Sequence, residues 1–583
     1  MAASAWTVVV LTTGGAAVSL VGVRLVSRDW VRPAVVAAAL IVAGYGAFGR
    51  RFNDEFQTIE HAATRAAPIV AVAAAAGAVT AALVWGTFAA AGTDASGYVS
   101  QAALWRDGRL IVDQPFVARV RWPNADAAFA PLGYDAAPEG HAIVPAYPPG
   151  LPLLMAAAQI VGGACAAYVV VPLAAGAAVW FCYLLGRRAR SPAVGAMAAL
   201  LLACSPVFVY QTLVPMSDVP AAACWTAALA FVTRRSHRHE PAAIAAAGCC
   251  AALALLIRPN LVLLALAVAP FAVRHEDPTD RWRPRLIAFA APLVVAGAVF
   301  GWINLHRYGS PLRSGYGNMR TAFAASHVAP NIAHWTGWLT ATETPLIVFA
   351  ALGVAVALAA PAGPLSRRSA ALVAAATFAV TLSYAGYAPF DEWSYLRFLL
   401  PAFPPLFVAM AAAILWMTTR LPAAVGVTAV LVLVVGMAGH GVRYLTAAGV
   451  GSLRDEARRY VAVARFATEQ TPANAVYISL QHSGSLRYYS RRPVIRFDRI
   501  GVDLDRAVAD LQQAGWRPYV VLEDWEETQF KQQFAAASET GRLAGRPIAR
   551  LMKYGVNVYD PQAETRAGPR EIPLSTDMAC IDR

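Results

Sequence analysis

The sequence contains little charge for its length. Charged residues make up only 14% of its 583 residues, whereas hydrophobic residues make up 58%. Soluble globular proteins carry roughly 25% charged residues, so this deficit excludes a soluble chain with a large core. Apolar runs of roughly 18 or more residues recur, each long enough to cross a hydrocarbon layer of about 30 Å. The sequence therefore predicts a polytopic membrane protein.

Lysine is almost absent. It occurs only at Lys531 and Lys553, so the net charge of +13 comes from arginine. Most arginines lie in short loops between apolar runs, and no basic stripe with interleaved aromatic residues is present. We therefore expect contact with membrane lipids and no nucleic acid partner. The seven cysteines show no disulfide framework or metal-binding spacing, and six of them, in or beside apolar runs, are interpreted as packing residues.

The apolar runs predict an all-α polytopic fold with about 11–13 transmembrane helices. They cover residues 5–26, 31–49, 67–90, 166–185, 192–210, 214–233, 241–257, 261–273, 286–305, 338–360, 370–387, 396–417 and 422–440. The run 151–161 is too short to span the membrane and predicts an interfacial helix instead. An amphipathic stretch at 97–105 predicts a second juxtamembrane helix.

Arginine placement orients this fold. With the N-terminus inside, five arginine-containing loops face the cytoplasm, as the positive-inside pattern requires. Only the hairpin with Arg24, Arg28 and Arg32 conflicts with this orientation. The orientation makes residues 92–149 the first large outer loop. We predict a multi-pass protein of the bacterial cytoplasmic membrane, with the loop and the C-terminal region outside the cytoplasm.

Composition divides the chain into four regions. Residues 1–66 form an N-terminal transmembrane hairpin and residues 67–445 a transmembrane core. After residue 451, predicted strands at 475–480, 493–497 and 518–522 alternate with predicted helices, so residues 452–560 are expected to form a small soluble α/β domain. Residues 561–583 are a polar, flexible tail. No internal repeat is evident.

Two acidic residues lie where predicted spans meet the outer side. Asp94 follows the span 67–90, and Asp218 opens the span 214–233. A carboxylate at such a position faces a polar cavity and has a role in most proteins. The alternative is structural: Asp94, or Ser217 and Asp218, caps the start of a helix. Position alone leaves both interpretations open.

Further polar residues lie at the same level. The motif Tyr147-Pro-Pro-Gly150 precedes the interfacial helix, where the prolines fix its direction and the glycine allows close approach, although a simple turn explains the prolines equally well. Arginine suits a phosphate because its fork matches two oxygens, whereas snorkelling at the interface explains any single arginine. Binding candidates are Tyr98, His141, Tyr147, Arg258, Arg307, Tyr308, Asp391, Glu392 and Arg397. For His141, an ordinary loop histidine is the alternative to a metal or phosphate ligand.

These motifs together resemble the GT-C superfamily of integral membrane glycosyltransferases. The resemblance is to the bacterial branch related to protein O-mannosyltransferases and lipid A aminoarabinose transferases. It rests on the order of Thr93-Asp-Ala-Ser-Gly-Tyr98, Tyr147-Pro-Pro-Gly150, Ser217-Asp-Val-Pro220, Arg307-Tyr-Gly-Ser-Pro-Leu312 and Tyr395-Leu-Arg-Phe-Leu-Leu-Pro401. It covers about residues 67–440.

The resemblance implies an inverting glycosyltransferase that uses a polyprenyl-phosphate-linked sugar at the outer face. It assigns Asp94 as the catalytic residue, which takes or orients the acceptor proton, and Asp218 as a second acidic residue of the site. The acceptor is then a hydroxyl of a lipid, a glycan or a protein. Arg258, Arg307 and Arg397 are assigned to the donor phosphate from their charge and side. Metal dependence differs among relatives, which leaves a divalent cation open as a cofactor.

The sequence departs from the family in two places. Asp94 is followed by Ala95 and Ser96, where relatives often carry paired acidic residues, and no lysine lies near the Tyr147 motif. The missing lysine argues against aminoarabinose specificity. A transporter or flippase of a lipid-linked glycan is the main alternative. A transporter predicts two similar halves and broken helices near the midplane; the sequence shows neither, and its polar residues lie at one interface. A non-catalytic scaffold leaves Asp94, Asp218 and the arginines without a role.

Overall fold

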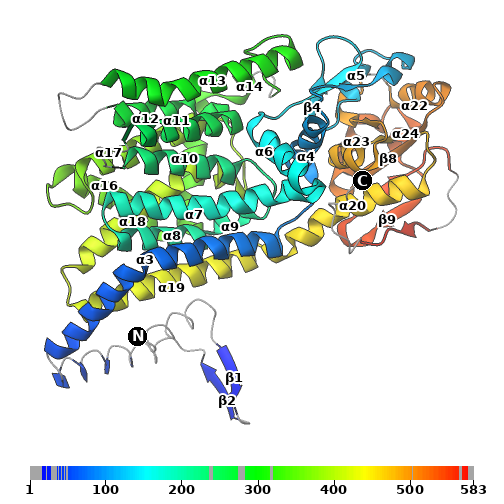
Figure 1. Ribbon diagram of the computed structural model, residues 1–583. Coiled ribbons are helices and arrows are strands. Elements are labelled where there is room, and N and C mark those ends of the chain that lie inside the picture. Colours follow the sequence, from blue (N-terminus) through cyan, green and yellow to red (C-terminus); the bar gives the residue numbers. More distant parts are fainter. Residues whose placement is uncertain are drawn as a thin grey trace.

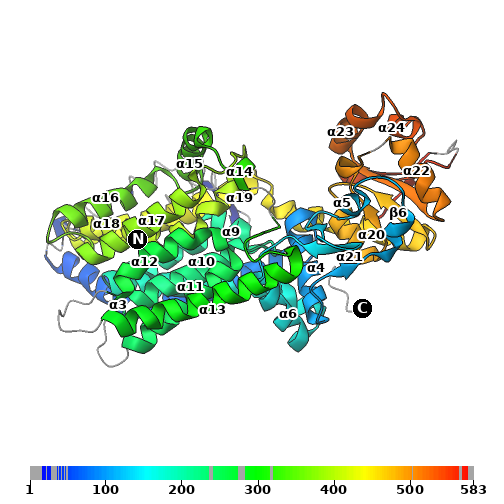
Figure 2. The same cartoon turned by 90° about the horizontal axis from the view of Figure 1, so that it is seen from above.

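The structure is a computed structural model. It describes residues 16–20, 23–27, some positions between 36 and 47, and residues 50–234, 240–273, 282–315, 319–501, 503–563 and 568–574. From residue 50 onward, Figures 1 and 2 show a bundle of roughly parallel helices with a smaller mixed α/β part at one end. Helices α4 and α6 lie between these two parts in both views. The predicted fold class is thus confirmed.

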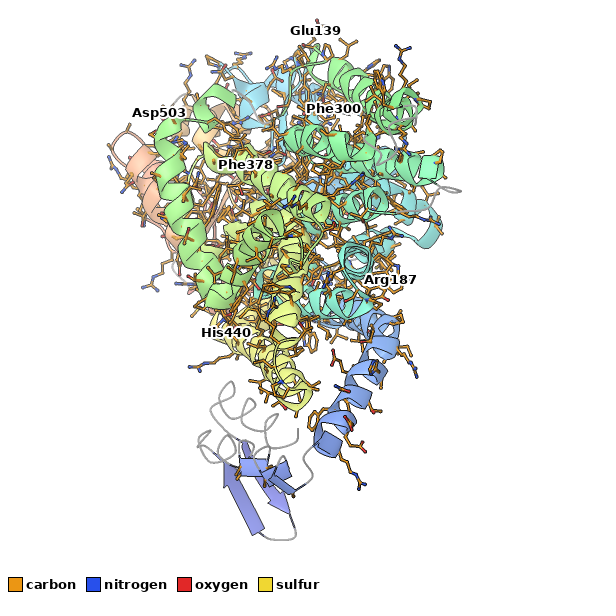
Figure 3. All side chains as sticks on the ribbon, turned by 90° about the vertical axis from the view of Figure 1, so that its left-hand side faces the viewer. Glu139, Arg187, Phe300, Phe378, His440 and Asp503 are labelled. Atoms are coloured by element: carbon orange, nitrogen blue, oxygen red, sulfur yellow. The ribbon has the colours of Figure 1, made fainter. Side chains whose placement is uncertain are left out.

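Apolar helices make up the bundle. Within the described residues, six helical segments are long and apolar enough to cross a membrane, or up to eight if each of two bent pairs counts as one span. The six contain α3 (Arg50–Trp85), α7 (Val170–Ala189), α13 (Trp282–Tyr308), α17 (Arg367–Ala385), α18 (Phe403–Thr418) and α19 (Ala423–Ala447). The shorter apolar helices α10 (Asp218–Val232), α11 (Glu240–Ile257) and α12 (Val262–Val273) pack among them. Viewed from the end opposite the α/β part, side chains fill the space between the helices (Figure 3).

Two predicted spans are broken. The pair α8 (Pro192–Cys204) and α9 (Pro206–Thr212) bends by 64°, and the pair α15 (Val328–Thr342) and α16 (Val348–Ala359) bends by 111°. Proline cannot donate the helical hydrogen bond, so each second segment starts anew, with Pro206 and the short turn at Pro345. The predictions of one continuous helix over 192–210 and over 338–360 are therefore wrong, and the absence of broken helices expected from the sequence is not found.

The N-terminal region is only partly described. Within the predicted span 5–26, β1 (Ala16–Leu20) and β2 (Val23–Ser27) pair antiparallel, a conformation that β-branched valine favours. The remainder of that span, and most of the predicted span 31–49, lie outside the described residues. The hairpin predicted for residues 1–66 stays a prediction, and α3 already begins at Arg50.

The outer loop is folded. Residues 92–149 contain α4 (Gly92–Arg106) and the strands β3 (Val112–Asp113), β4 (Tyr134–Ala136) and β5 (Ala142–Pro145), and α6 (Gly150–Gly162) follows directly. The two predicted juxtamembrane helices are α4 and α6, whereas the three-stranded sheet, ordered β3-β5-β4, was not predicted. A Cβ at Gly150 would lie 2.5 Å from the backbone nitrogen of Ile257, so this glycine lets α6 start against the end of α11.

The C-terminal part begins with α20 (Leu453–Gln470) and is built on one sheet. Its strand order is β11-β9-β10-β8-β6-β7, with β6 parallel to both β7 and β8. The predicted strands appear as β6 (Ala475–Ile478), β7 (Val494–Ile495) and β8 (Arg517–Glu523), with α21 (Ser483–Ser490), α22 (Leu504–Gln513) and α23 (Asp524–Phe534) between or after them. Strands β9 (Ala549–Leu551), β10 (Val556–Tyr559) and β11 (Arg570–Glu571) were not predicted.

One hydrophobic core joins the outer loop to the C-terminal sheet. Val117, Trp122 and Phe129 from the loop are buried in the same cluster as Val476 and Phe497 from the C-terminal part. The Leu132 backbone N–H donates to Ser483 Oγ at 3.0 Å across 351 residues of sequence. The opposite side of the sheet packs on α20 through residues such as Ala462 and Val463. Loop and domain therefore form a single structural unit.

Most cysteines pack as predicted. Cys182 is buried, and Cys204, Cys224 and Cys250 are partly buried. Cys165, just after α6, is disulfide-bonded, so interpreting it as a plain packing residue was wrong.

Candidate active site

A cavity of about 670 Å³ lies where the outer loop, the helix ends and α20 meet. Its walls come from the start of α4, the segment before α10, the segment from Tyr387 to Phe398, and the start of α20. They include Asp94, Tyr98, Tyr147, Arg258, Glu392 and Arg397, six of the residues that the sequence predicted. Residues from four distant parts of the chain thus share one polar chamber.

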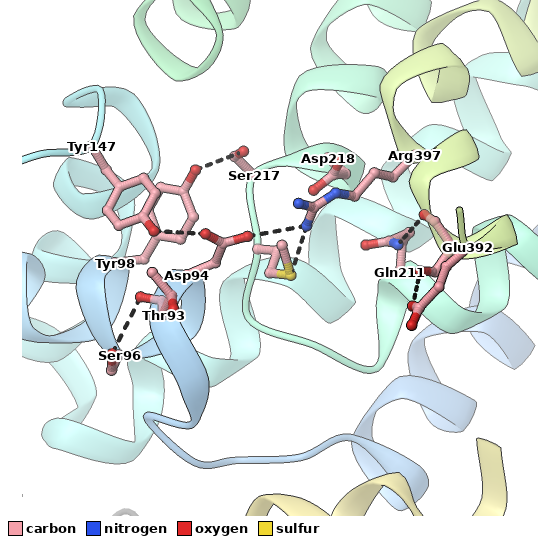
Figure 4. A network of polar contacts seen from close by, with 12 residues as sticks. Thr93, Asp94, Ser96, Tyr98, Tyr147, Gln211, Ser217, Asp218, Glu392 and Arg397 are labelled. Atoms are coloured by element: carbon pink, nitrogen blue, oxygen red, sulfur yellow. Dashed lines mark hydrogen bonds and ion pairs between the residues drawn. The ribbon is translucent and has the colours of Figure 1, made fainter. Parts of the chain in front are cut away.

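Asp94 is held on both oxygens (Figure 4). The Tyr147 hydroxyl donates to Oδ1 at 2.6 Å, and Arg397 Nη1 donates to Oδ2 at 3.1 Å. The carboxylate lies in the first turn of α4, where the N-cap residue is Ala91 and no side chain caps the helix. The capping interpretation therefore does not apply. The side chain keeps 31% of its surface exposed to the cavity, so a ligand can reach it.

Asp218 is buried behind the cavity wall. Its side chain is fully buried and accepts a hydrogen bond from Arg258 Nη2 at 2.6 Å. Arg258 also donates to Ser217 Oγ at 3.1 Å and to the Tyr384 hydroxyl at 3.0 Å. No side chain caps α10, so Asp218 is not a cap either. Because Arg258 lines the cavity and Asp218 does not, Asp218 influences the cavity through Arg258.

Arg397 is the second arginine of the cavity. It lies in the 3-10 segment Trp393–Ala402, which leads into α18. Its guanidinium lies 5.0 Å from the ring centre of Tyr395 and 5.4 Å from that of Phe398, which fixes its plane. Its Nε atom is buried and has no hydrogen-bond partner in the described part of the chain. Arg258 and Arg397 thus place two guanidinium groups in one chamber with Asp94.

Arg307 and Tyr308 do not line the cavity. Both Arg307 Nη atoms donate to the Tyr147 carbonyl oxygen at 3.3 Å, and the Tyr308 hydroxyl donates to the Pro145 carbonyl oxygen at 2.7 Å. Gln101 Nε2 also donates to the Tyr147 carbonyl, at 3.3 Å. These three side chains fix the end of β5 and the segment after it, which presents the Tyr147 hydroxyl to Asp94.

Of the remaining predicted residues, His141 and Asp391 lie outside the cavity, whereas Glu392 and Tyr98 line it. His141 contacts Asp126 at 2.8 Å and does not line the cavity, and neither does the exposed Asp391. Glu392 does line the cavity and accepts from the Ser394 hydroxyl at 3.5 Å. Tyr98 donates to Ser217 Oγ at 2.9 Å, and burial raises the pKa of its hydroxyl, with the nearby Asp94 charge adding to the shift. Tyr98 therefore stays protonated as a donor.

The C-terminal domain contributes residues that sequence reasoning missed. Arg459, Tyr460 and Gln481 line the cavity, and the polar ends of Tyr460 and Gln481 lie beside Gly92 at the start of α4. Gln481 Nε2 and Arg459 Nη2 both donate to the Tyr460 hydroxyl, at 2.9 Å and 3.2 Å. The only sequence signal was the charged helix 453–468, which gave no indication of where it would pack.

A buried carboxylate supports this part of the wall. Glu523 accepts hydrogen bonds from Arg459 Nε, from His482 Nε2 and from Trp525 Nε1, at 3.0, 3.0 and 2.8 Å. Burial by itself raises the pKa of Glu523, but the hydrogen bond and charge of His482 and the charge of Arg459 outweigh burial and hold it at about 2. Glu523 thus stays charged and fixes Arg459.

Among the described residues, no group of three or more His, Cys, Asp or Glu side chains is placed to hold a metal ion. The acidic residues that line the cavity are Asp94, Glu392 and Glu456, and Glu456 accepts from the Ser452 hydroxyl at 2.6 Å.

The comparisons with known proteins agree with this arrangement. Residues 147–303 match the family described as dolichyl-phosphate-mannose-protein mannosyltransferase. ArnT from Cupriavidus metallidurans bound to undecaprenyl phosphate shares the fold, with TM-score 0.55 and 14% identity over 86% of this chain and 99% of that one. Its apo state gives TM-score 0.56 with 14% identity over 85% and 98%. The oligosaccharyltransferase of Archaeoglobus fulgidus in the apo form gives TM-score 0.50 with 14% identity over 86% and 74%. No curated protein sequence matches.

Fold and family match together confirm the predicted resemblance to GT-C membrane glycosyltransferases. At 14% identity the structural matches establish the fold, and the family match covers the segment from Tyr147 to Ile303. The general reaction that these comparisons support is glycosyl transfer from a lipid-linked sugar.

Proposed function

We propose that the protein is an inverting glycosyltransferase that moves a sugar from a polyprenyl-phosphate donor to an acceptor hydroxyl at the outer face of the cytoplasmic membrane. The observation that carries this proposal is Asp94, held between Tyr147 and Arg397 in a cavity that also contains Arg258. During the reaction the acceptor hydroxyl loses a proton, and negative charge develops on the leaving phosphate. A base and two guanidinium groups in one cavity suit these two changes.

Asp94 is the proposed catalytic base. It accepts the proton of the acceptor hydroxyl as that oxygen forms a bond to the anomeric carbon. The bond from the anomeric carbon to the phosphate oxygen breaks on the opposite face, and the polyprenyl phosphate leaves with the electron pair. Attack and departure on opposite faces invert the anomeric centre.

Arg397 and Arg258 are proposed to bind the donor phosphate. A guanidinium fork donates two hydrogen bonds to phosphate oxygens and offsets the charge that develops on the leaving group. Asp218 is a positioning residue here, because its contact at 2.6 Å fixes the direction of Arg258. This differs from the catalytic role predicted for Asp218 from the sequence. Arg307 likewise acts through Tyr147, and Tyr308 through Pro145, two residues earlier.

Two observations support an orientation in which the cavity and the outer loop lie outside the cytoplasm. The arginine-rich loop that follows α7 lies at the end of the bundle opposite α6, because α7 runs away from α6. Cys165, beside α6, is disulfide-bonded, and disulfides form in oxidising compartments.

The test compares Asp94→Asn with the matched control Asp54→Asn, an exposed position on α3. Full-length protein in nanodiscs receives a panel of radiolabelled polyprenyl-phosphate sugars and a membrane extract as the source of acceptors. We expect Asp94→Asn to lower sugar transfer by about 10²–10⁴-fold, the usual contribution of general base catalysis, while Asp54→Asn keeps it. Full transfer by Asp94→Asn contradicts the assignment. Lipid translocation without transfer in the native protein favours a flippase.

A further inference from the structure

The C-terminal domain contributes three polar side chains to the cavity that holds Asp94. Arg459 and Tyr460 lie on α20, and Gln481 shortly precedes α21. The reaction proposed above gives none of them a role. A Cβ at Gly92 would lie 3.6 Å from Gln481 Nε2 and 3.7 Å from the Tyr460 hydroxyl. This cluster of three residues therefore lies beside the first turn of α4, which also carries Asp94.

Buried groups of the domain hold the cluster in place. Glu523, which is buried, pairs with Arg459 at 3.0 Å. The buried ring of His482 lies 4.5 Å from the ring of Tyr460. Gln481 Nε2 donates to the Tyr460 hydroxyl at 2.9 Å, which joins two members of the cluster to each other. The three side chains thus keep their arrangement before any ligand binds, as a recognition site requires.

Each member of the cluster keeps hydrogen-bonding capacity that the described residues do not use. The Tyr460 oxygen accepts bonds from Gln481 Nε2 and Arg459 Nη2, so its own hydrogen is left to donate. Burial raises the pKa of this hydroxyl, which therefore keeps its proton. Arg459 uses Nε on Glu523 and Nη2 on Tyr460, and its Nη1 has no partner in the described ranges. The side-chain oxygen of Gln481 accepts no bond from a described residue.

These free groups define the chemistry of the ligand. Two donors and one acceptor oxygen require a ligand that both accepts and donates hydrogen bonds. A phosphate diester only accepts them, whereas a hydroxyl does both. Adjacent hydroxyls on one ring are the mark of a carbohydrate. The cavity volume of about 670 Å³ also has room for a sugar, since small-molecule sites measure roughly 300–1,000 Å³.

We propose that Arg459, Tyr460 and Gln481 form a carbohydrate-recognition subsite that takes adjacent hydroxyl groups of a sugar ring. The Tyr460 hydroxyl and Arg459 Nη1 donate to hydroxyl oxygens, and the Gln481 side-chain oxygen accepts a hydroxyl hydrogen. This inference rests on the proposed function, because the sugar of the lipid-linked donor and a sugar residue of a glycan acceptor both carry this chemistry. The C-terminal domain thereby selects the sugar on which Asp94 and the arginines act.

Binding of simple glycosides tests the subsite without requiring transfer. Full-length protein in nanodiscs is titrated with the methyl glycosides of mannose, glucose, galactose and arabinose, and saturation-transfer NMR measures each Kd. We expect one glycoside to bind, and one of its monodeoxy analogues to bind about tenfold more weakly, because the lost hydroxyl leaves a polar group of the site unpaired. Absence of binding overturns the proposal, and so does equal binding of the glycoside and all its monodeoxy analogues.

Matched variants link the binding to the cluster. Tyr460→Phe removes the donor, keeps the ring beside His482, and should weaken glycoside binding about tenfold. Arg459→Lys keeps a charge for Glu523 but loses the guanidinium fork, and should weaken binding about threefold. Tyr519→Phe, a buried tyrosine of β8 that does not line the cavity, is the control and should bind like the native protein. Native affinity in both folded cluster variants overturns the proposal.

Competition identifies the source of the sugar. If the subsite takes the donor sugar, a polyprenyl-phosphate sugar displaces the bound glycoside and sugar-free polyprenyl phosphate does not. If the subsite takes a sugar of the acceptor, the glycoside stays bound with either lipid. Equal displacement by both lipids would place the lipid phosphate at the cluster and overturn the proposal.

The subsite and the proposed reaction fail in different ways. Full transfer by Asp94→Asn contradicts the catalytic base, but glycoside binding that depends on Tyr460 still supports the subsite. Glycoside binding that does not depend on Tyr460 or Arg459, in a protein that transfers sugar, contradicts the subsite alone.

Discussion

At the scale of single residues, the site depends on side chains whose hydrogen bonds are already made. Asp94 is fixed by Tyr147 from one side and by Arg397 from the other. Such preorganisation spares the enzyme the cost of orienting its base at the moment of reaction. Removing one of these contacts should therefore affect the rate of turnover more than the binding of substrates.

Tyr147→Phe tests this expectation. The variant keeps the ring and its packing against Tyr98, whose centre lies 4.4 Å away, and loses only the hydroxyl at Asp94. A hydrogen bond to a charged group contributes roughly 1.5–3 kcal/mol, so we expect kcat to fall about tenfold or more with KM nearly unchanged. Steady-state transfer assays measure both constants. Tyr554→Phe, a tyrosine that does not line the site cavity, is the control; a rise in KM alone would contradict the positioning role.

Glu523 predicts a pH dependence of stability. Its pKa is about 2 in the folded protein, against an ordinary value of 4.5. Between these values the unfolded state binds more protons, so Glu523 stabilises the fold above pH 4.5 and this contribution is lost as the pH falls toward 2. Glu523→Gln should lower stability at pH 6 by roughly 3 kcal/mol at most.

Thermal unfolding between pH 6 and pH 3 checks this prediction. The melting temperature of the native protein should fall steeply as the pH falls over that range, and the melting temperature of Glu523→Gln should fall less. Parallel curves for the two proteins would show that Glu523 is not held in its charged form.

At the scale of elements, glycine sets how closely helices approach. Gly150 starts α6 against the end of α11, where a Cβ would lie 2.5 Å from the Ile257 nitrogen and 2.6 Å from the Leu256 carbonyl carbon. Gly150→Ala should push the two backbones apart and cost about 1–3 kcal/mol. Thermal unfolding should show the loss, with Gly545→Ala as the control, because no atom lies within 4 Å of the Cβ position there. An unchanged melting temperature would contradict the close approach.

The same element shows what sequence can and cannot predict. The Tyr147 motif predicted both the helix and the close approach at Gly150, because proline and glycine act locally. Strand β9 has only three residues and β10 has four, too few for an alternating pattern to stand out. The packing of α20 and α21 brings Arg459, Tyr460 and Gln481 to the cavity. This packing is a long-range contact, which no local sequence pattern predicts. Asp218 was predicted as a catalytic residue from its position at the start of a span, and its burial behind Arg258 could not be foreseen.

At the scale of the whole molecule, topology determines which compartment supplies the substrates. One cysteine replaces Glu139, between β4 and β5, and another replaces Arg190, directly after α7. In Figure 1, β4 lies near the α/β part, whereas α7 runs away from it. In intact bacterial cells we expect a membrane-impermeant thiol reagent to label Glu139→Cys and to leave Arg190→Cys unlabelled, because arginine-rich loops stay in the cytoplasm. The reverse pattern would contradict the topology and, with it, the outer location of the site.

The core shared by the outer loop and the C-terminal sheet has a consequence for synthesis. Val117, Trp122 and Phe129 leave the ribosome long before Val476 and Phe497, their partners in the cluster. Contacts across 351 residues, such as Leu132 with Ser483, form only once nearly the whole chain exists. The loop that carries Asp94 therefore stays unfinished until the last domain arrives. A prematurely terminated chain would reach the membrane with its helices inserted but without the assembled cavity around Asp94, so that, under the proposed function, only completed chains would use a lipid-linked sugar.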